Sequence, residues 1–381
     1  MINSIIDLQK FKDIIEYCKR CGFCLPYCPT YEIHRRIETI SPRGKLLMSL
    51  GIITGNLRIR LRTAELLFSC TLCNRCSQAC PAGINISDTL LRTRILLFKN
   101  KLLPHSISKI VSNMILERNP YGVDLNNKNF WFDFTSMEIE NKANVAIWMG
   151  CTTALKRPEL AAHVYEVVKY FEKSVAVIDN EPCCGIPLLY AGDLEGYYRS
   201  LKESLKAIST TKASIVITPC PSCLRAFRQF PQLFNVKVPF RVMHVIEYLW
   251  ERIAKKKSMK LEYHNEVSVT YHDPCELARH MNIYKEPREL LKSINNINFI
   301  EMNNSGINSK CCGGGGLYMG FNFDKALAIA SLRLYDVPKG VKIITTACPT
   351  CESILSVAIN NSGRPLKVVD IVDIVHEILF S

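Results

Sequence analysis

The chain has 381 residues, which at about 150 residues per domain predicts two or three compact units. Its 48% hydrophobic and 22% charged residues are ordinary for a globular protein and exclude a long disordered, collagen-like or coiled-coil chain. Two totals stand out, 18 cysteines and a formal net charge of +13. The cysteines are too sparse for a small disulfide scaffold, and a chain of this length can bury a core without disulfides.

The sequence shows no sign of secretion or of membrane insertion. The first 17 residues contain Asp7, Asp13 and Glu16 and lack the charged-then-apolar pattern of a secretory signal. No run of about 18 apolar residues is present, so no spanning helix is expected. We therefore expect a reducing, cytoplasmic location, with the cytoplasmic face of a membrane as the alternative, and metal binding as the first explanation of the cysteines.

Eight cysteines lie in two runs with the spacing C-x2-C-x2-C-x3-C, each followed by proline, and helices are predicted between the runs at 43–53 and 58–69. This spacing is that of bacterial-type ferredoxins, in which the fourth cysteine of each run binds the other [4Fe–4S] cluster. Zinc is the alternative, but structural zinc sites favour separated cysteine pairs. The two predicted cubane sites are Cys18, Cys21, Cys24 and Cys80, and Cys70, Cys73, Cys76 and Cys28.

The other ten cysteines form two sets of five, with the patterns C-x31-CC-x35-C-x2-C and C-x35-CC-x35-C-x2-C. Matching cysteines of the last four positions are 128 residues apart, and residues 218–223 resemble residues 346–351, which indicates a duplicated unit. Buried core thiols are the alternative, since free cysteine is commonly buried. The sets are Cys151, Cys183, Cys184, Cys220 and Cys223, and Cys275, Cys311, Cys312, Cys348 and Cys351.

Each copy alternates short apolar strands with amphipathic helices, which is typical of a small parallel α/β sheet. The cysteines follow the strands, so they are expected to meet at the carboxyl edge of each sheet, where such sheets bind ligands. The predicted elements are strands 145–149, 175–178 and 214–218 with helices 158–171 and 194–208 in the first copy, and strands 267–271, 297–302 and 341–345 with helices 287–294 and 323–335 in the second.

Together these motifs resemble the iron–sulfur oxidoreductases with paired cysteine-rich CCG domains, such as the heterodisulfide reductase catalytic subunit and the iron–sulfur subunits of glycolate oxidase, D-lactate dehydrogenase and anaerobic glycerol-3-phosphate dehydrogenase. The resemblance implies an α-helical ferredoxin-like domain with two [4Fe–4S] cubanes at 1–120, a linker at 121–143, and duplicated α/β CCG domains, each with a small parallel sheet, at 144–255 and 264–381. It also implies a further, non-cubane [4Fe–4S] cluster at one or both five-cysteine sets; a structural role or another metal is the alternative for one set.

Within this family, the segment Ser41-Pro42-Arg43-Gly44 and the run from Cys70 resemble the glycolate oxidase iron–sulfur subunit. This favours an electron-transfer subunit of a flavin-dependent 2-hydroxyacid dehydrogenase of the glycolate or D-lactate type, passing electrons from the cubanes to the CCG sites and on to a quinone or other acceptor. The chain has no G-x-G-x-x-G motif, so FAD is expected only in a partner subunit. The alternative is a heterodisulfide reductase-like subunit, in which a CCG-bound cluster reduces a disulfide.

Three polar residues near Cys275 are candidates to influence a cluster. His272, Asp273 and Arg279 are expected to relay protons or to hydrogen-bond cluster sulfur, and the alternative is a strand-end His and Asp that cap the following helix. In the first copy, Met149 and Gly150 are taken to occupy the corresponding place. The glycines at 313–316 are expected to let the backbone approach a cluster closely.

Positive charge is concentrated in the first 120 residues, which hold 18 basic and 8 acidic residues. This excess suits docking of an acidic partner, here the FAD-containing dehydrogenase subunit, or of a membrane surface or quinone-reactive partner. Nucleic acid is not an expected partner, since no groove-reading element accompanies the charge. Residues 107–115 are predicted as a core-facing helix, with a membrane-surface helix as the alternative. The basic residues assigned to the docking surface include Arg58, Arg60, Arg62, Arg92 and Arg94.

Overall fold

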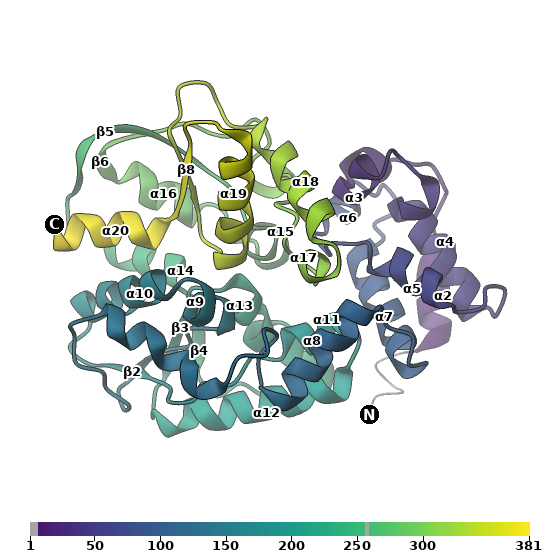
Figure 1. Ribbon diagram of the computed structural model, residues 1–381, viewed down its shortest axis with the longest axis horizontal. Helices are drawn as coiled ribbons and strands as arrows, with labels where there is room; N and C mark the ends of the chain where they lie inside the picture. The colour runs from purple at the N-terminus through teal and green to yellow at the C-terminus, as the bar shows by residue number, and fades with distance from the viewer. Residues whose placement is uncertain (1–6, 256–258) are drawn as a thin grey trace.

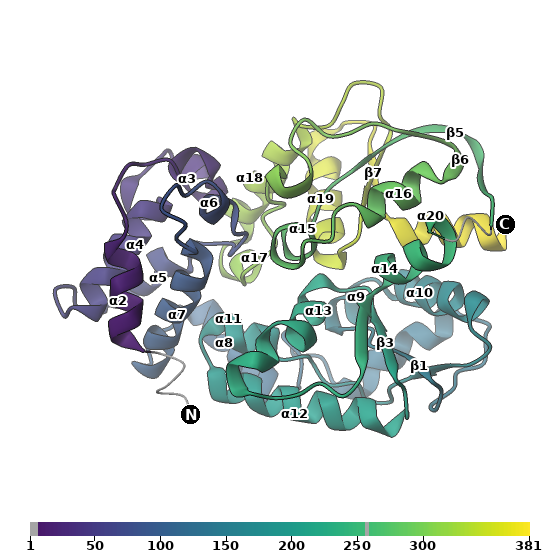
Figure 2. The ribbon, with the colours of Figure 1, turned by 180° about the vertical axis from the view of Figure 1, so that it is seen from behind.

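The computed structural model describes residues 7–255 and 259–381 (Figure 1). Residues 1–6, which belong to the segment predicted to lack a signal, lie outside the described residues. The chain forms a helical part and two α/β parts. In Figure 1 the two α/β parts lie one above the other and the helical part lies beside both of them, and Figure 2 shows the same arrangement from behind.

The helical part carries both ferredoxin-type cysteine runs. Helix α3 begins at Pro29, directly after Cys28, because proline suits the first turn of a helix, where its missing N–H is not needed. Helices lie where they were predicted between the two runs. The elements of this part are α2 (Leu8–Glu16), η1 (Leu25–Tyr27), α3 (Pro29–Ile33), η2 (Glu38–Ile40), α4 (Pro42–Ile53), α5 (Leu61–Phe68), α6 (Arg75–Gln78) and α7 (Ile86–Lys99). The next helix, α8 (His105–Leu116), lies against the α/β parts.

The first α/β part is a four-stranded parallel sheet of order β2-β1-β3-β4. Its central strands are short and buried, as expected where helices cover both faces of a parallel sheet. The strands are β1 (Val145–Ile147), β2 (Val175–Val177), β3 (Ile215–Thr218) and β4 (Arg241–His244). The helices are η3 (Leu125–Phe134), α9 (Cys151–Lys156), α10 (Pro158–Phe171), α11 (Ile186–Ala191), α12 (Leu194–Thr210), α13 (Pro221–Arg228), η4 (Phe230–Phe234), α14 (Val245–Leu249) and η5 (Trp250–Ala254).

The second α/β part repeats this topology, with the parallel order β6-β5-β7-β8. The duplication predicted from the sequence is therefore present in the fold. The strands are β5 (Leu261–Tyr271), β6 (Ile294–Phe299), β7 (Ile343–Thr346) and β8 (Lys367–Asp370). The helices are α15 (Cys275–Met281), α16 (Glu286–Lys292), η6 (Gly306–Asn308), α17 (Tyr318–Phe321), α18 (Phe323–Leu334), α19 (Pro349–Ser362) and α20 (Ile371–Phe380).

The backbone pairing gives the correspondence between the two copies. The N–H of Trp148 donates to Ile217 O at 2.8 Å, and the N–H of His272 donates to Thr345 O at the same distance. Because the two acceptors are 128 residues apart, as the matching cysteines are, Trp148 is the counterpart of His272. The pairing of His272 and Asp273 with Met149 and Gly150 was therefore wrong by one residue.

Helix α8 is core-facing, as the sequence predicted, since Ile107, Val111 and Met114 are buried. Its last turn leaves Ile115 and Leu116 exposed. Within the described part of the chain, no helix combines the length and the apolar character needed to cross a bilayer.

Candidate metal centres

The structure gathers the eight cysteines of the helical part around two small cavities. Each cavity is lined by three cysteines of one run and the fourth cysteine of the other, which is the grouping predicted from the ferredoxin spacing. The first is lined by Cys18, Cys21, Cys24 and Cys80, and the second by Cys28, Cys70, Cys73 and Cys76.

Each run coils around its cavity through two residues with left-handed backbone. Arg20 and Gly22 have φ of 54° and 84°, and the matching positions of the second run, Leu72 and Asn74, have φ of 52° and 63°. A left-handed conformation costs roughly 1–2 kcal/mol for a residue with a Cβ atom. That two unrelated side chains, of Arg20 and Leu72, adopt it at the same place indicates that the coiling of the cysteine loop fixes this backbone.

The ten remaining cysteines lie at the carboxyl ends of the strands, and all ten are buried and free. In the first set, Cys184 Sγ lies 3.5 Å from Cys223 Sγ, and in the second set, Cys312 Sγ lies 3.2 Å from Cys351 Sγ. Gly150, with φ of 79°, lets the backbone just before Cys151 lie close to Cys223, since a Cβ atom at Gly150 would lie 3.1 Å from Cys223 Sγ. We call the two sets CCG site 1 and CCG site 2, as divided in the sequence analysis.

The two CCG sites open onto one shared cavity of about 260 Å³ between the α/β parts. All five cysteines of CCG site 1 and four of CCG site 2 line it, while Cys311 does not. Few polar side chains share the wall. Among them are Tyr121, Thr152, Tyr190 and Glu276.

The surroundings of the sulfur atoms fit metal-bound thiolates. Backbone N–H groups donate to Cys70 Sγ, Cys311 Sγ and Cys312 Sγ at 3.3–3.4 Å. Burial raises the pKa of Cys24 to about 11, so as a free thiol it would stay protonated and inert. Coordination to iron would displace that proton, and backbone N–H groups would stabilise the bound thiolates. Cysteine sulfur in this number suits iron–sulfur clusters.

Buried cationic side chains beside the cysteines give a second, independent argument for metal-bound thiolates. Lys45, Arg94 and Arg279 are 1%, 0% and 7% exposed, and among the described residues each donates only to carbonyl or hydroxyl oxygens and to no carboxylate. A buried cation needs a counter-charge. Each lies beside predicted ligands, Lys45 and Arg94 beside Cys70 and Arg279 beside Cys73. Cluster-bound thiolates would supply the missing negative charge.

Arg94 corrects one part of the sequence interpretation. It was assigned to a basic docking surface, but it is fully buried, and burial lowers its pKa to about 10. Its guanidinium donates to Cys70 O at 2.7 Å and Phe68 O at 3.4 Å in the helical part. It also donates to Tyr190 O at 3.1 Å and Gly316 O at 2.8 Å, and so joins all three parts of the chain.

A buried ion pair that the sequence did not indicate lies beside CCG site 1. Lys128 Nζ contacts Glu181 Oε1 at 2.6 Å, and both side chains are at most 4% exposed. The Glu181 carboxylate also accepts the N–H groups of Met149 and Gly150 at 2.6 and 2.9 Å, which fixes the backbone just before Cys151. Lys128 and Glu181 are far apart in the chain, so only the fold brings this pair together.

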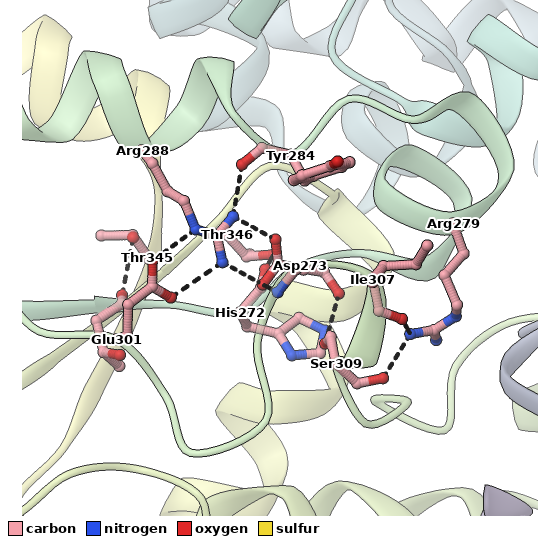
Figure 3. A network of polar contacts seen from close by, with 12 residues as sticks. His272, Asp273, Arg279, Tyr284, Arg288, Glu301, Ile307, Ser309, Thr345 and Thr346 are labelled. Atoms are coloured by element: carbon pink, nitrogen blue, oxygen red, sulfur yellow. Dashed lines mark hydrogen bonds and ion pairs between the residues drawn. The ribbon is translucent and has the colours of Figure 1, made fainter. Parts of the chain in front are cut away.

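The polar residues predicted beside CCG site 2 have separate roles (Figure 3). Asp273 does not cap the following helix; it binds Arg288 through both carboxylate oxygens, at 2.6 and 2.8 Å, and accepts the N–H of Gly306. Arg279 donates to Cys73 O at 2.7 Å and to Ser309 O at 2.5 Å. It therefore ties the second cubane loop to CCG site 2.

The segment that suggested a glycolate oxidase subunit has a packing role. Ser41 begins α4 by accepting the N–H of Gly44 at 2.9 Å, and Arg43 donates to Arg20 O at 2.8 Å in the first cysteine run. A Cβ atom at Gly44 would lie 2.1 Å from Glu38 O, so only glycine fits there. These contacts position a cluster loop and carry no information about a partner's substrate.

The protein families that match this chain divide it into the same helical part and two α/β parts. The profile of the 4Fe-4S dicluster domain family matches residues 14–84, and that of the cysteine-rich CCG domain family matches residues 145–228 and 269–356. A subunit of the dihydromethanophenazine:CoB–CoM heterodisulfide reductase of Methanosarcina mazei is 30% identical over 96% of this chain and 94% of its own. The probable glycolate oxidase iron–sulfur subunit of Bacillus subtilis is 23% identical over 92% of this chain and 90% of its own.

A third relative, a subunit of the fumarate reductase (CoM/CoB) of Methanothermobacter marburgensis, is 26% identical over 97% of this chain and 72% of its own. All three relatives are named as oxidoreductases or their subunits. The resemblance stated from the sequence is confirmed, but its preference for the glycolate oxidase branch is not, because the heterodisulfide reductase subunits match at higher identity. The chain belongs to the family of iron–sulfur oxidoreductase subunits in which a 4Fe-4S dicluster domain precedes two cysteine-rich CCG domains.

Proposed function

We propose that this chain is the disulfide-reducing subunit of a complex of the heterodisulfide reductase type, acting on a small-molecule disulfide. The observation that carries the proposal is the cavity shared by the two CCG sites. A subunit that only conducts electrons needs its redox centres in a row, whereas a shared cavity gives one substrate access to two centres at once. Clusters at the two CCG sites would take up part of its volume of about 260 Å³, so the remaining space suits a small molecule rather than a protein disulfide.

In this proposal the two cysteine groups of the helical part hold [4Fe–4S] cubanes, and both CCG sites hold [4Fe–4S] clusters of the non-cubane kind. The contact between Cys73 and Cys311 supports a route from the second cubane site to CCG site 2. When bound, the clusters supply the electrons one at a time.

Reduction of a disulfide takes up two electrons and two protons, breaks the S–S bond and yields two thiols. The protons must reach a cavity with few polar groups. Tyr190 Oη donates to the Glu276 carboxylate at 2.9 Å and accepts from Arg225 at 2.9 Å. Burial raises the pKa of Tyr190 well above its ordinary value, so it keeps its proton at neutral pH. We assign Tyr190 Oη as a proton-holding group of the cavity wall, with Glu276 and Arg225 fixing its orientation.

The partner subunit is proposed to deliver electrons at the first cubane site. Cys21 is exposed there, and the neighbouring Tyr17 and Phe23 are 65% and 63% exposed. Exposed aromatic side chains are typical of protein interfaces. We place the complex in the cytoplasm, where free cysteines persist.

The test is an assay of the anaerobically purified, iron-loaded chain with a reduced viologen dye. We expect dye oxidation that depends on an added small-molecule disulfide, proceeds without flavin and releases two thiols per disulfide. The Cys184→Ala and Cys312→Ala variants should abolish it while the cubane signals in electron paramagnetic resonance (EPR) spectra persist. Absence of disulfide-dependent oxidation in a chain with all its clusters would refute the proposal.

A second candidate is the electron-transfer subunit of a flavin-dependent 2-hydroxyacid dehydrogenase, favoured by the full-length similarity to the glycolate oxidase iron–sulfur subunit. FAD would then reside in the partner. This function predicts that the chain accepts electrons from glycolate or D-lactate only when a flavoprotein subunit is added, and that disulfides have no effect.

A further inference from the structure

His272 is a buried polar side chain beside the sulfur atoms of CCG site 2. A ring nitrogen of His272 and the sulfurs of Cys312 and Cys351 lie within 4.8 Å of one another. The residue is 1% exposed, and its Nε2 atom is buried without a hydrogen-bond partner among the described residues. A buried nitrogen of this kind needs either a metal ion to bind or an acceptor for its proton.

The other ring nitrogen decides between these two roles. Arg333 Nε lies 3.1 Å from His272 Nδ1, and arginine can only donate. Nδ1 must therefore be the acceptor, and the single proton of a neutral imidazole is on Nε2. A histidine that bound iron through Nε2 would need its proton on Nδ1, where the N–H of Arg333 already points.

The arrangement around the ring is rigid, so this choice of tautomer is fixed by the fold. Arg333 is 1% exposed and is held by Asp336, whose carboxylate lies 2.7 Å from Nη1. The His272 main chain is fixed on both sides, since its N–H donates to Thr345 O and its carbonyl accepts from Thr346 Oγ1 at 3.1 Å (Figure 3).

We propose that His272 is a hydrogen-bond donor to the metal-bound sulfur of CCG site 2, through Nε2–H, and not a metal ligand. The inference rests on the proposed cluster at this site and not on the disulfide substrate. Hydrogen bonds to cluster sulfur stabilise the more negative, reduced state and raise the reduction potential. His272 therefore makes CCG site 2 easier to reduce than its cysteines alone would.

The duplication places a different ring at the matching position of CCG site 1. The counterpart of His272 in the first copy is Trp148, as the backbone pairing shows. Trp148 has a single ring nitrogen, whose N–H is also buried without a hydrogen-bond partner among the described residues, and the ring packs edge-on against Phe227, with ring centroids 5.0 Å apart. An imidazole whose tautomer is fixed by arginine is therefore a property of CCG site 2, the site that adjoins the second cubane cysteines through Cys73 and Cys311.

Two measurements on the full iron-loaded chain test the proposal. The first measurement is pulsed EPR of the reduced protein with 15N-labelled histidine. The EPR signal that is lost in the Cys351→Ala variant is assigned to CCG site 2. We expect only weak nitrogen coupling and one exchangeable proton coupling that disappears in D2O. A strong coupling to histidine nitrogen would mean direct ligation and would overturn the proposal.

In the second, EPR-monitored redox titrations compare variants at unchanged iron content. His272→Leu should shift the midpoint potential of CCG site 2 to a more negative value, and His272→Gln, which keeps an N–H donor, should restore part of the shift. Trp148→Phe is the matched control and should leave the potential of CCG site 2 unchanged. An unaltered potential in His272→Leu would overturn the proposal. Because disulfide turnover enters neither measurement, failure of the proposed function would be seen separately.

Discussion

The thiol of Cys73, in the second ferredoxin-type run, contacts the thiol of Cys311 in CCG site 2. Both cysteines belong to one buried cluster of side chains that includes the other cysteines of CCG site 2. Among the described residues, no cysteine of CCG site 1 has a corresponding contact with a cysteine of either predicted cubane site. For the proposed clusters, we expect this contact to set an order, in which CCG site 2 is reduced before CCG site 1.

This order predicts the effect of replacing Arg279, which joins Cys73 O to Ser309 O. In Arg279→Met the two loops lose their shared donor and separate, and electron transfer slows steeply with distance. After mixing with a reduced dye, freeze-quench EPR should show cubanes reduced at the normal rate and CCG sites reduced more slowly. Arg62→Met, at a 77% exposed side chain of the helical part, is the control. Equal CCG reduction rates in both variants would contradict the order.

Arg94→Met should destabilise the whole chain. The change leaves buried carbonyl groups of three parts without their donor, and unpaired buried polar groups cost about 1–3 kcal/mol each. We expect the free energy of unfolding to fall by roughly 3 kcal/mol or more, seen as a lower melting temperature of the iron-loaded protein. Arg92→Met, on the same helix and paired with Asp88 at 2.8 Å, should cost at most about 1 kcal/mol. Similar melting temperatures for the two variants would show that Arg94 does not join the parts.

Two glycines of the second α/β part form a matched pair. Gly316 and Gly340 have φ of 63° and 81°, so alanine meets the same kind of backbone strain at both. At Gly316 the Cβ atom would also lie 2.6 Å from the carbonyl carbon of Thr71 in the second cubane loop, whereas at Gly340 it meets nothing within 4 Å. Gly316→Ala should therefore perturb the EPR signal of the second cubane, and Gly340→Ala should leave it unchanged. The reverse result would contradict the packing of this glycine against the cubane loop.

The interface between α10 and α20 should be sensitive to acid. His376 stacks on His163 with ring centroids 3.9 Å apart, between the carboxylates of Glu166 and Asp373. Burial, together with the charge of His163, lowers the pKa of His376 below its ordinary value near 6.5. The unfolded chain then binds the proton more readily, so this residue's contribution to stability is lost as the pH falls below about 6.5.

The variant His376→Asn removes that titration. Its melting temperature should fall less between pH 7.5 and pH 5.5 than that of the unaltered protein, although it starts lower because the stack is lost. His264→Asn, at a half-exposed histidine that contacts Glu377, serves as the control. An unchanged pH dependence in His376→Asn would show that the stacked pair does not titrate in this range.

Much of the site was predictable because its signals are local. The cysteine spacings place sulfur atoms at the ends of strands or around one loop, and the duplication repeats the pattern with the same 128-residue offset. The fourth strand of each sheet was not predicted, although the strands lie in two segments with similar sequences, Pro-Phe-Arg-Val-Met-His at 239–244 and Pro-Leu-Lys-Val-Val-Asp at 365–370. Strands β4 and β8 are four residues long, begin with an exposed basic residue and end in the helix caps His244 and Asp370, so they lack an apolar run.

What the sequence could not show depends on contacts between distant segments. Arg94 was counted with the surface charge because nothing in its neighbours distinguishes it from Arg92. The shared cavity and the contact of Cys73 with Cys311 arise only when the three parts pack together. The tautomer of His272 depends on Arg333, which lies in another helix.

The burial of Cys73 against Cys311 also bears on how the protein matures. Docking of the helical part onto the second α/β part closes the cysteines of two metal centres in a single step, and Arg94 then ties that junction to the first α/β part. If the proposed clusters form at these cysteines, we expect iron and sulfide to be inserted while the parts are still separate. The fold would then set the order of biogenesis, with cofactor assembly first and closure of the chain afterwards.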